Sequence, residues 1–144
     1  MRFDELPRDW AQRPITDPDV FEGVVDLIVT EQTRSDGATY LLLMHDNGRL
    51  LQPICLPDEP HRVDVGEVLE GVGALLAEVG RHDVHDVVIV IARPGRATPT
   101  PRDRDLRAAF EDACRTAGLT LHAVAIAAPE AVAVMPAEGG CAAA

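Results

Sequence analysis

The run Val87–Ile91, five consecutive β-branched residues with no polar residue among them, constrains the fold more than any other feature of the chain. β-branched residues favour strands, because their side chains pack well on a pleated surface. A strand that is covered on one face alternates apolar and polar residues, whereas a strand covered on both faces is continuously apolar. The run therefore predicts a central strand with helices on both sides of the sheet, which is typical of an α/β domain.

Helix and strand signals alternate around this central strand. Apolar residues recur at helical spacing in three segments, and they form short apolar runs in several others. We expect helices over 16–30, 64–80 and 101–118, strands over 39–44, 49–56, 87–91 and 119–127, a short edge strand over 132–135, and a loop over 32–37. This order predicts a single three-layer α/β domain with a mixed sheet of about four or five strands.

Local chemistry marks several of the expected boundaries. Asn47-Gly48 between two apolar runs is a strong hairpin signal, because both residues tolerate positive φ. Thr100, with a proline after it and Asp103 three residues on, is typical of a capping box at a helix start. Thr16 and Asp64 are expected to cap the other two helices, and Gly80 to end the second.

The length of the chain, 144 residues, is that of one domain. We expect the domain to span residues 16–136, preceded by an irregular arm over 1–15 and followed by a disordered small-residue tail over 137–144. The three cysteines, Cys55, Cys114 and Cys141, are far apart and form no Cys-x-x-Cys pair. They predict neither a disulfide framework nor a thiolate zinc site.

Composition excludes several classes of function. All 13 basic residues are arginine and Ser35 is the only serine, so a phosphate-loop lysine and a Gly-x-Ser-x-Gly nucleophile are both absent. The formal net charge of −11 argues against a nucleic-acid partner, which needs clustered cations. The acidic N-terminus does not resemble a signal peptide, and no apolar run approaches membrane-spanning length, so we expect a cytoplasmic protein without membrane association.

The loop after the central strand reverses the charge of the rest of the chain. From Arg93 to Arg107 there are five arginines and two aspartates, a local charge of +3, beside the start of a helix whose free amides favour an anion. We therefore take a small anion as a candidate ligand, held by Arg93, Arg96, Arg102 and Arg104 with Asp105 beside them. The alternative is that these arginines only neutralise the acidic remainder.

The histidines provide a weaker signal. His82 and His85 lie close in sequence, but they precede the central strand, whereas ligands in open α/β sheets gather at the carboxyl ends of strands. We therefore predict no metal there. His45 falls at the tip of the expected hairpin, where a solvated turn is the simpler interpretation.

A longer pattern resembles a known family. The hairpin Tyr40–Leu50, a helix, a hydrophobic strand ending in Ile91-Ala92-Arg93-Pro94, the loop Pro99-Thr100-Pro101-Arg102, then Asp105, a helix and a last strand follow the order of the RadC branch of the JAMM metalloprotease-like family. The resemblance covers roughly residues 20–135. It implies a JAMM or cytidine-deaminase-like fold, with His-x-His-Pro, Pro-Thr-Pro-Ser and a metal-binding Asp at these three places.

The departures from that family pattern lie at its metal site. Ile91 and Arg93 replace both metal-binding histidines, Arg102 replaces the serine, and the loop is one residue longer. Glu31 lies in the region where the family's catalytic Glu is expected. Zinc needs three protein ligands and an open position, and Asp105 alone cannot hold it. Arg93 would repel the ion and could instead pair with Asp105.

We therefore expect a metal-free, cofactor-free and non-catalytic relative of this family, which acts as an interaction or regulatory module with a protein partner or by self-association. The anion binder described above is one alternative. A hydrolase with a rebuilt site, using His45, Cys55 or His122 with Asp105, is the other, although sequence spacing certifies no pair among these residues.

Overall fold

The computed structural model describes residues 5–57 and 65–135, which form a mixed α/β domain around a five-stranded sheet. The strand order is β2-β1-β3-β4-β5, so β3 is central as the apolar run predicts. The strands are β1 (Ala38–Met44), β2 (Leu50–Pro57), β3 (Asp86–Ala92), β4 (Thr120–Ala127) and β5 (Val132–Val134). Strands β3 and β4 are parallel, and the other neighbouring pairs are antiparallel.

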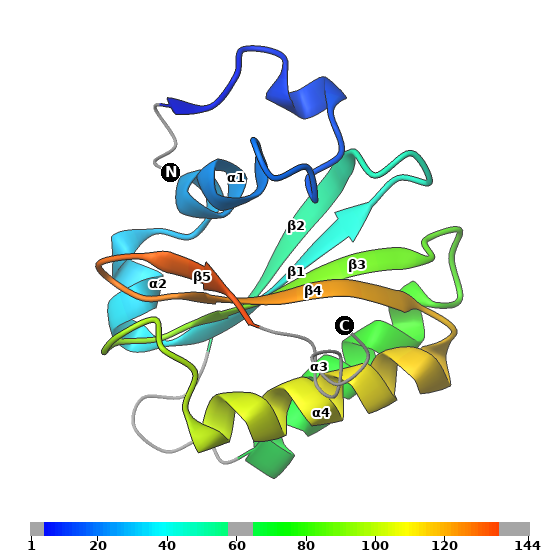
Figure 1. Ribbon diagram of the computed structural model, residues 1–144. Coiled ribbons are helices and arrows are strands. Elements are labelled where there is room, and N and C mark those ends of the chain that lie inside the picture. The colour runs from blue at the N-terminus through cyan, green and yellow to red at the C-terminus, as the bar shows by residue number, and fades with distance from the viewer. Residues whose placement is uncertain (1–4, 58–64, 136–144) are drawn as a thin grey trace, which may run out of the picture.

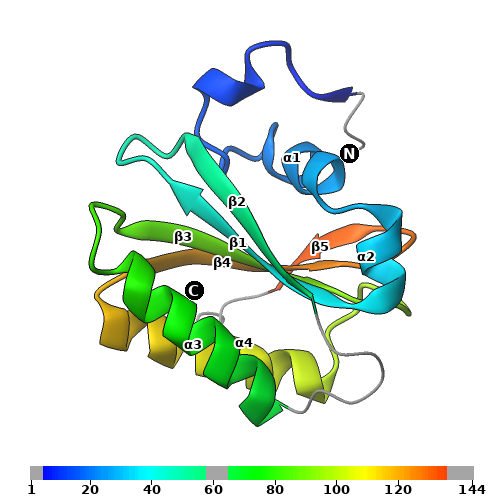
Figure 2. The ribbon, with the colours of Figure 1, turned by 180° about the vertical axis from the view of Figure 1, so that it is seen from behind.

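Helices lie on both faces of the sheet, which gives the expected three layers (Figures 1 and 2). Helices α3 (Val65–Val79) and α4 (Pro101–Ala117) cover one face, and α1 (Phe21–Ile28) covers the other. The short helix α2 (Glu31–Asp36) lies at one end of the sheet.

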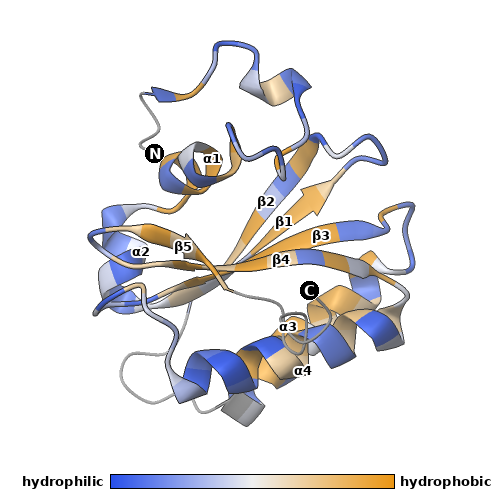
Figure 3. Ribbon diagram, in the orientation of Figure 1, coloured by the Kyte–Doolittle hydropathy of each residue, from blue (hydrophilic) through white to orange (hydrophobic). Residues whose placement is uncertain are grey.

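Side-chain alternation along the strands divides the core into two parts. Leu41, Ile89 and Ile126 point toward α3 and α4 and pack around Phe110. The neighbouring residues in each strand point toward α1 instead, as Leu42 does on β1. Figure 3 shows the result, because the central strands are hydrophobic along most of their length. Strand β1 is buried at every position, which explains its unbroken apolar sequence.

The hairpin and the last helix begin and end where the sequence predicts. Gly48 has φ +89° in the turn between β1 and β2. Thr100 accepts a hydrogen bond from the Asp103 amide, and the Asp103 side chain accepts one from the Thr100 amide, which completes the capping box. Gly118 ends α4 in the left-handed conformation. The expected Asp64 cap of α3 lies outside the described residues.

Two expectations near the N-terminus are wrong. Helix α1 begins at Phe21 rather than after Thr16, because Asp17 forms a turn instead: its carboxylate accepts hydrogen bonds from the Asp19 amide, at 2.9 Å, and from Arg13, at 2.8 Å. Residues 32–37, expected to be a loop, are mostly helical, since Thr30 caps α2 by accepting from the Thr33 amide.

The N-terminal arm contains a short 3-10 helix, η2 (Trp10–Gln12), and packs on the domain. Leu6 and Trp10 contact the core on the α1 side, and the Ile15 amide donates to the Gly48 carbonyl at 2.9 Å. The expected tail, 137–144, lies outside the described residues. In the described part of the chain, no helix has the length and hydrophobicity needed to cross a membrane.

Candidate functional site

The carboxyl ends of β3 and β4 meet at one end of the sheet, and four segments converge there. They are the loop that leads from β3 to α4, the start of α4, the turn between β4 and β5, and α2 (Figure 1). The Arg93 amide donates to the Ala127 carbonyl at 3.1 Å, which fixes the starts of the two loops side by side. Parallel strands expose their carboxyl ends at the same edge of a sheet, where ligands of open α/β folds usually bind.

Arg93 is held by the loop that follows it. Its Nε donates to Asp103 Oδ1 at 3.0 Å and its Nη2 to Asp103 Oδ2 at 2.6 Å, a bidentate ion pair. The other three N–H groups donate to the carbonyls of Pro94, Arg96 and Thr98 at 2.7–3.1 Å. A guanidinium has five N–H donors, so every one on Arg93 already has a partner within the protein.

Asp103 is the anion at the start of α4. Its side chain is fully buried, and besides Arg93 it accepts the Thr100 amide at 2.8 Å. Burial alone raises the pKa of this carboxyl, but the Arg93 and Thr100 hydrogen bonds outweigh it and hold the pKa below the ordinary value of 3.8. The positive end of the helix dipole acts in the same direction. The charge at the helix start is therefore neutralised internally.

This arrangement separates the residues that the sequence predicts as one anion site. Arg93 pairs with Asp103 and not with Asp105, which is exposed on α4. Arg96 and Arg104 are exposed and Arg102 is half-buried. Arg93 has no N–H left for an external anion, so anion binding stays a prediction that only the other three arginines could carry.

The residues of the hydrolase alternative also lie apart. His122 pairs with Asp86 at 2.8 Å at the amino end of β3, while Asp105 lies near the start of α4 at the carboxyl end, about 18 Å along the helix from its last residue. His45 is exposed in the hairpin turn next to Met44, whose strand partner is Asp86, so it belongs to the amino end as well. Within 5–57 and 65–135, no group of three or more His, Cys, Asp and Glu side chains is placed to hold a metal ion.

The other histidines and cysteines show no convergence in the described residues. His82 pairs with Glu78 at 3.2 Å on the surface, and His85 is exposed. Cys55 is exposed on β2, whereas Cys114 is buried in α4. Burial, with a smaller contribution from Glu111, raises the pKa of the Cys114 thiol to about 11, so it is not a reactive nucleophile.

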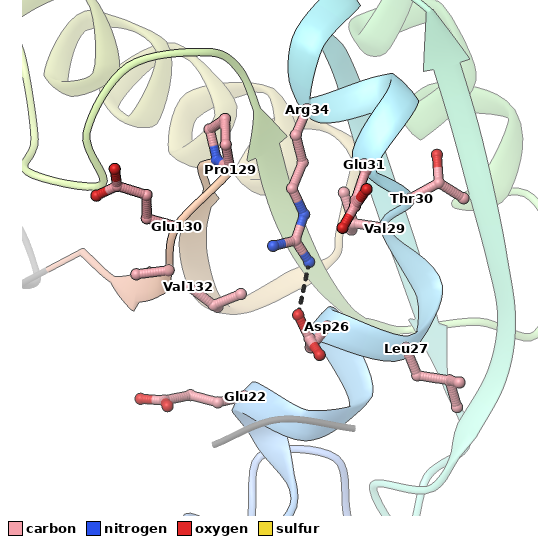
Figure 4. A pocket seen from close by; sticks show the side chains of 11 residues that line it. Glu22, Asp26, Leu27, Val29, Thr30, Glu31, Arg34, Pro129, Glu130 and Val132 are labelled. Carbon is pink, nitrogen blue, oxygen red and sulfur yellow. Dashed lines mark hydrogen bonds and ion pairs between the residues drawn. The ribbon is translucent and has the colours of Figure 1, made fainter. Parts of the chain in front are cut away.

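A pocket of about 550 Å³ lies at the same end of the sheet, between α1, α2 and the turn after β4. Arg34 reaches into it from α2, and Glu22, Asp26, Glu31 and Glu130 line it (Figure 4). The Arg34 side chain is only 6% exposed; its Nη2 donates to Asp26 Oδ1 at 3.0 Å and its Nη1 to the Ala128 carbonyl at 3.1 Å.

The sequence does not reveal this pocket, and the reason is physical. The segment around Arg34 was expected to be a loop, and the carbonyl that orients the side chain is 94 residues away in the chain. Glu31 was singled out only through the family resemblance. The Thr30 cap that builds α2 is the one local signal that could have placed these residues on a helix.

Comparisons with known proteins do not assign the chain to a family. No protein-family model matches the chain, and no curated protein matches it. The mixed α/β domain with its five-stranded sheet therefore stands on the structure alone, and the kinship with the JAMM family stays a prediction.

Proposed function

We propose that this chain is a non-catalytic, metal-free α/β domain that acts by binding a protein partner. The observation that supports the proposal most strongly is the hydrogen bonding of Arg93. All five N–H groups of its guanidinium donate to Asp103 or to loop carbonyls. Arg93 stands where the resemblance to the RadC branch expects a metal-binding histidine. The loop is organised around a fixed positive charge instead of a metal ion.

The neighbours of Arg93 support the same conclusion. Ile91, at the other expected histidine position, is 3% exposed and packs in the core beneath α3 and α4. Asp105 is exposed on α4 and does not face Arg93. A catalytic zinc needs three protein ligands around one open position, and the positive charge of Arg93 would oppose the ion.

The surface favours a basic protein as the partner. The formal net charge is −11, so the field of the whole domain attracts positively charged proteins and speeds their association. The same charge disfavours nucleic acid, whose recognition requires clustered cations on the protein.

Two measurements test this proposal. The purified chain, expressed in medium supplemented with zinc and manganese, is analysed for metals beside a zinc-binding control protein. We expect far less than one metal ion per chain, and a stoichiometric transition metal would refute the metal-free assignment.

The second measurement is quantitative affinity capture from a lysate, with an unrelated acidic domain of similar charge as the reference bait. We expect at least one basic protein to be enriched on this chain over the reference. Increasing salt should release this protein from the bait, because the Debye length falls to about 3 Å at 1 M salt and charge attraction over longer distances is screened. Enrichment that is identical on both baits would contradict a specific interaction.

A further inference from the structure

The Arg34 pocket differs from the Arg93 loop in one respect that points to a ligand. Of the five N–H donors on the Arg34 guanidinium, two have partners among residues 5–57 and 65–135, namely Asp26 and the Ala128 carbonyl. Its Nε is buried and finds no acceptor in the described part of the chain. A buried donor without an acceptor costs about 1–3 kcal/mol. Nη1 and Nη2 form the tip of the Arg34 side chain in the pocket (Figure 4), so a ligand oxygen that accepts from one of their remaining N–H groups would be stabilising.

The charges around the pocket decide which kind of ligand fits. Glu22, Asp26, Glu31 and Glu130 contribute four carboxylates to its lining, and Arg34 contributes one positive charge. The formal charge of the described lining residues is therefore −3. A free anion would meet a net repulsion, although Arg34 by itself would attract it.

The ligand must therefore offer a positive charge to the carboxylates and an acceptor oxygen to Arg34. A peptide segment that carries arginine or lysine has both, because its side chain is cationic and each backbone carbonyl accepts hydrogen bonds. Glu31, on α2, and Glu130, in the turn after β4, are both exposed and lie on opposite sides of Arg34, with the Glu130 carboxylate pointing away from it (Figure 4). Both line the pocket and are accessible to such a side chain.

We propose that the Arg34 pocket binds an arginine- or lysine-bearing segment of a basic protein partner. Arg34 donates to a backbone carbonyl of the segment, and Glu31 and Glu130 pair with its cationic side chain. The inference rests on the proposed function, for which it supplies the binding site and the chemistry of the partner. It also places that site at the carboxyl end of the parallel strand β4, on the α1 side of the sheet.

The test is a titration of the isotopically labelled chain, followed by amide chemical shifts. The probes are a capped pentapeptide that alternates glycine and arginine, and the same peptide with citrulline, which keeps the shape and loses the charge. We expect saturable shifts in α2 and in the turn after β4 with the arginine peptide only. No saturable binding, or shifts centred elsewhere, would overturn the proposal.

Two charge-matched double variants separate a site from diffuse attraction. Glu31→Gln with Glu130→Gln removes two carboxylates from the pocket, and Glu70→Gln with Asp83→Asn removes two exposed carboxylates elsewhere. We expect the first pair to weaken binding of the arginine peptide roughly tenfold, and the second by less than about twofold, since exposed ion pairs contribute up to about 1 kcal/mol each. Equal weakening in both would overturn the proposal.

A third variant tests the donor role of Arg34. Arg34→Lys keeps the charge beside Asp26 but loses the planar donor fork. With folding verified by thermal unfolding, we expect roughly fivefold weaker binding of the arginine peptide, the effect of one hydrogen bond. Unchanged affinity would remove Arg34 from the site and overturn its assigned role.

These outcomes remain distinguishable from failure of the proposed function. A partner that is captured equally by the wild-type chain and by the variant at Glu31 and Glu130 would leave the interaction function standing and overturn this site. Failure of the wild-type chain to enrich any partner would overturn both.

Discussion

Replacing Arg93 by methionine tests the central structural claim, that this arginine organises the loop between β3 and α4. Methionine keeps most of the length and volume of the side chain and removes the charge with all five donors. The Asp103 carboxylate would then stay buried without its arginine and would keep the hydrogen bond from the Thr100 amide. The carbonyls of three loop residues would also lose their donor.

The size of the effect follows from the burial of the pair. Removing one partner from a buried ion pair costs about 3–5 kcal/mol, because the other charge is left uncompensated. Asp103 is 0% exposed and Arg93 is 15% exposed, so the lower end applies. We expect a loss of about 3 kcal/mol in the free energy of unfolding, which corresponds to a fall in Tm of about 10 °C for a chain of this size.

Urea unfolding followed by circular dichroism measures this loss, with Arg96→Met as the matched control in the same loop. The Arg96 side chain is exposed, and its substitution should change stability by less than about 0.5 kcal/mol. A double-mutant cycle with Asp103→Asn should give a coupling of about 2 kcal/mol. If Arg93→Met were as mild as Arg96→Met, the interpretation of Arg93 as the organiser of the loop would be refuted.

Three further predictions concern the pH dependence of stability, the reactivity of the cysteines and the hairpin turn. The pKa of Asp103 is lower in the folded than in the unfolded chain, so its ionised carboxylate stabilises the fold above the unfolded pKa of 3.8, and this contribution is lost as the pH falls below that value. The midpoint of urea unfolding should therefore drop between about pH 5 and pH 2, and the drop should be shallower in Asp103→Asn. Burial raises the pKa of the Cys114 thiol to about 11, so Cys114 should resist alkylation by iodoacetamide at pH 8 in the native chain, whereas the exposed Cys55 should react. Peptide mapping by mass spectrometry measures both rates, and equal rates would contradict the packing of α4. Gly48→Ala puts a side chain at a residue with φ +89° and places its Cβ 2.9 Å from Pro14 Cβ, so the free energy of unfolding should fall by about 1–3 kcal/mol. Thermal unfolding measures this change, and an unchanged Tm would mean that the arm does not pack on this turn.

Much of the fold was predictable because its signals are local. The run Val87–Ile91 predicts a strand covered on both faces, and β3 is the central strand with cores on both sides. Asn47-Gly48 and the Thr100 capping box act over three or four residues, so their energetics do not depend on distant contacts. The predictions near Asp17 and Gln32 were wrong because each segment carries signals for both a turn and a helix start. The sequence alone does not show which of the two structures is more stable there.

For the Arg93 loop, the sequence predicts the position in the fold but not the partners of the charged side chains. The sequence places a charged, proline-rich loop at the carboxyl end of the central strand, and that is where Arg93 lies. It assigns the wrong partner, because Asp103 and Asp105 are two residues apart on one helix and differ by about 200° around its axis. Only the packed helix shows that Asp103 faces inward, where its carboxylate closes the loop, while Asp105 faces solvent.

The layers, the central strand, the hairpin and the helix boundaries that carry a capping box or a terminal glycine follow from the amino-acid sequence. Each of these depends on periodicity or on hydrogen bonds between residues close in the chain. Tertiary structure alone decided which charges meet: Arg93 with Asp103 on one side of the sheet, and Arg34 with Asp26 and the Ala128 carbonyl on the other. An arginine side chain is long enough to reach many partners, and only the packed chain selects among them.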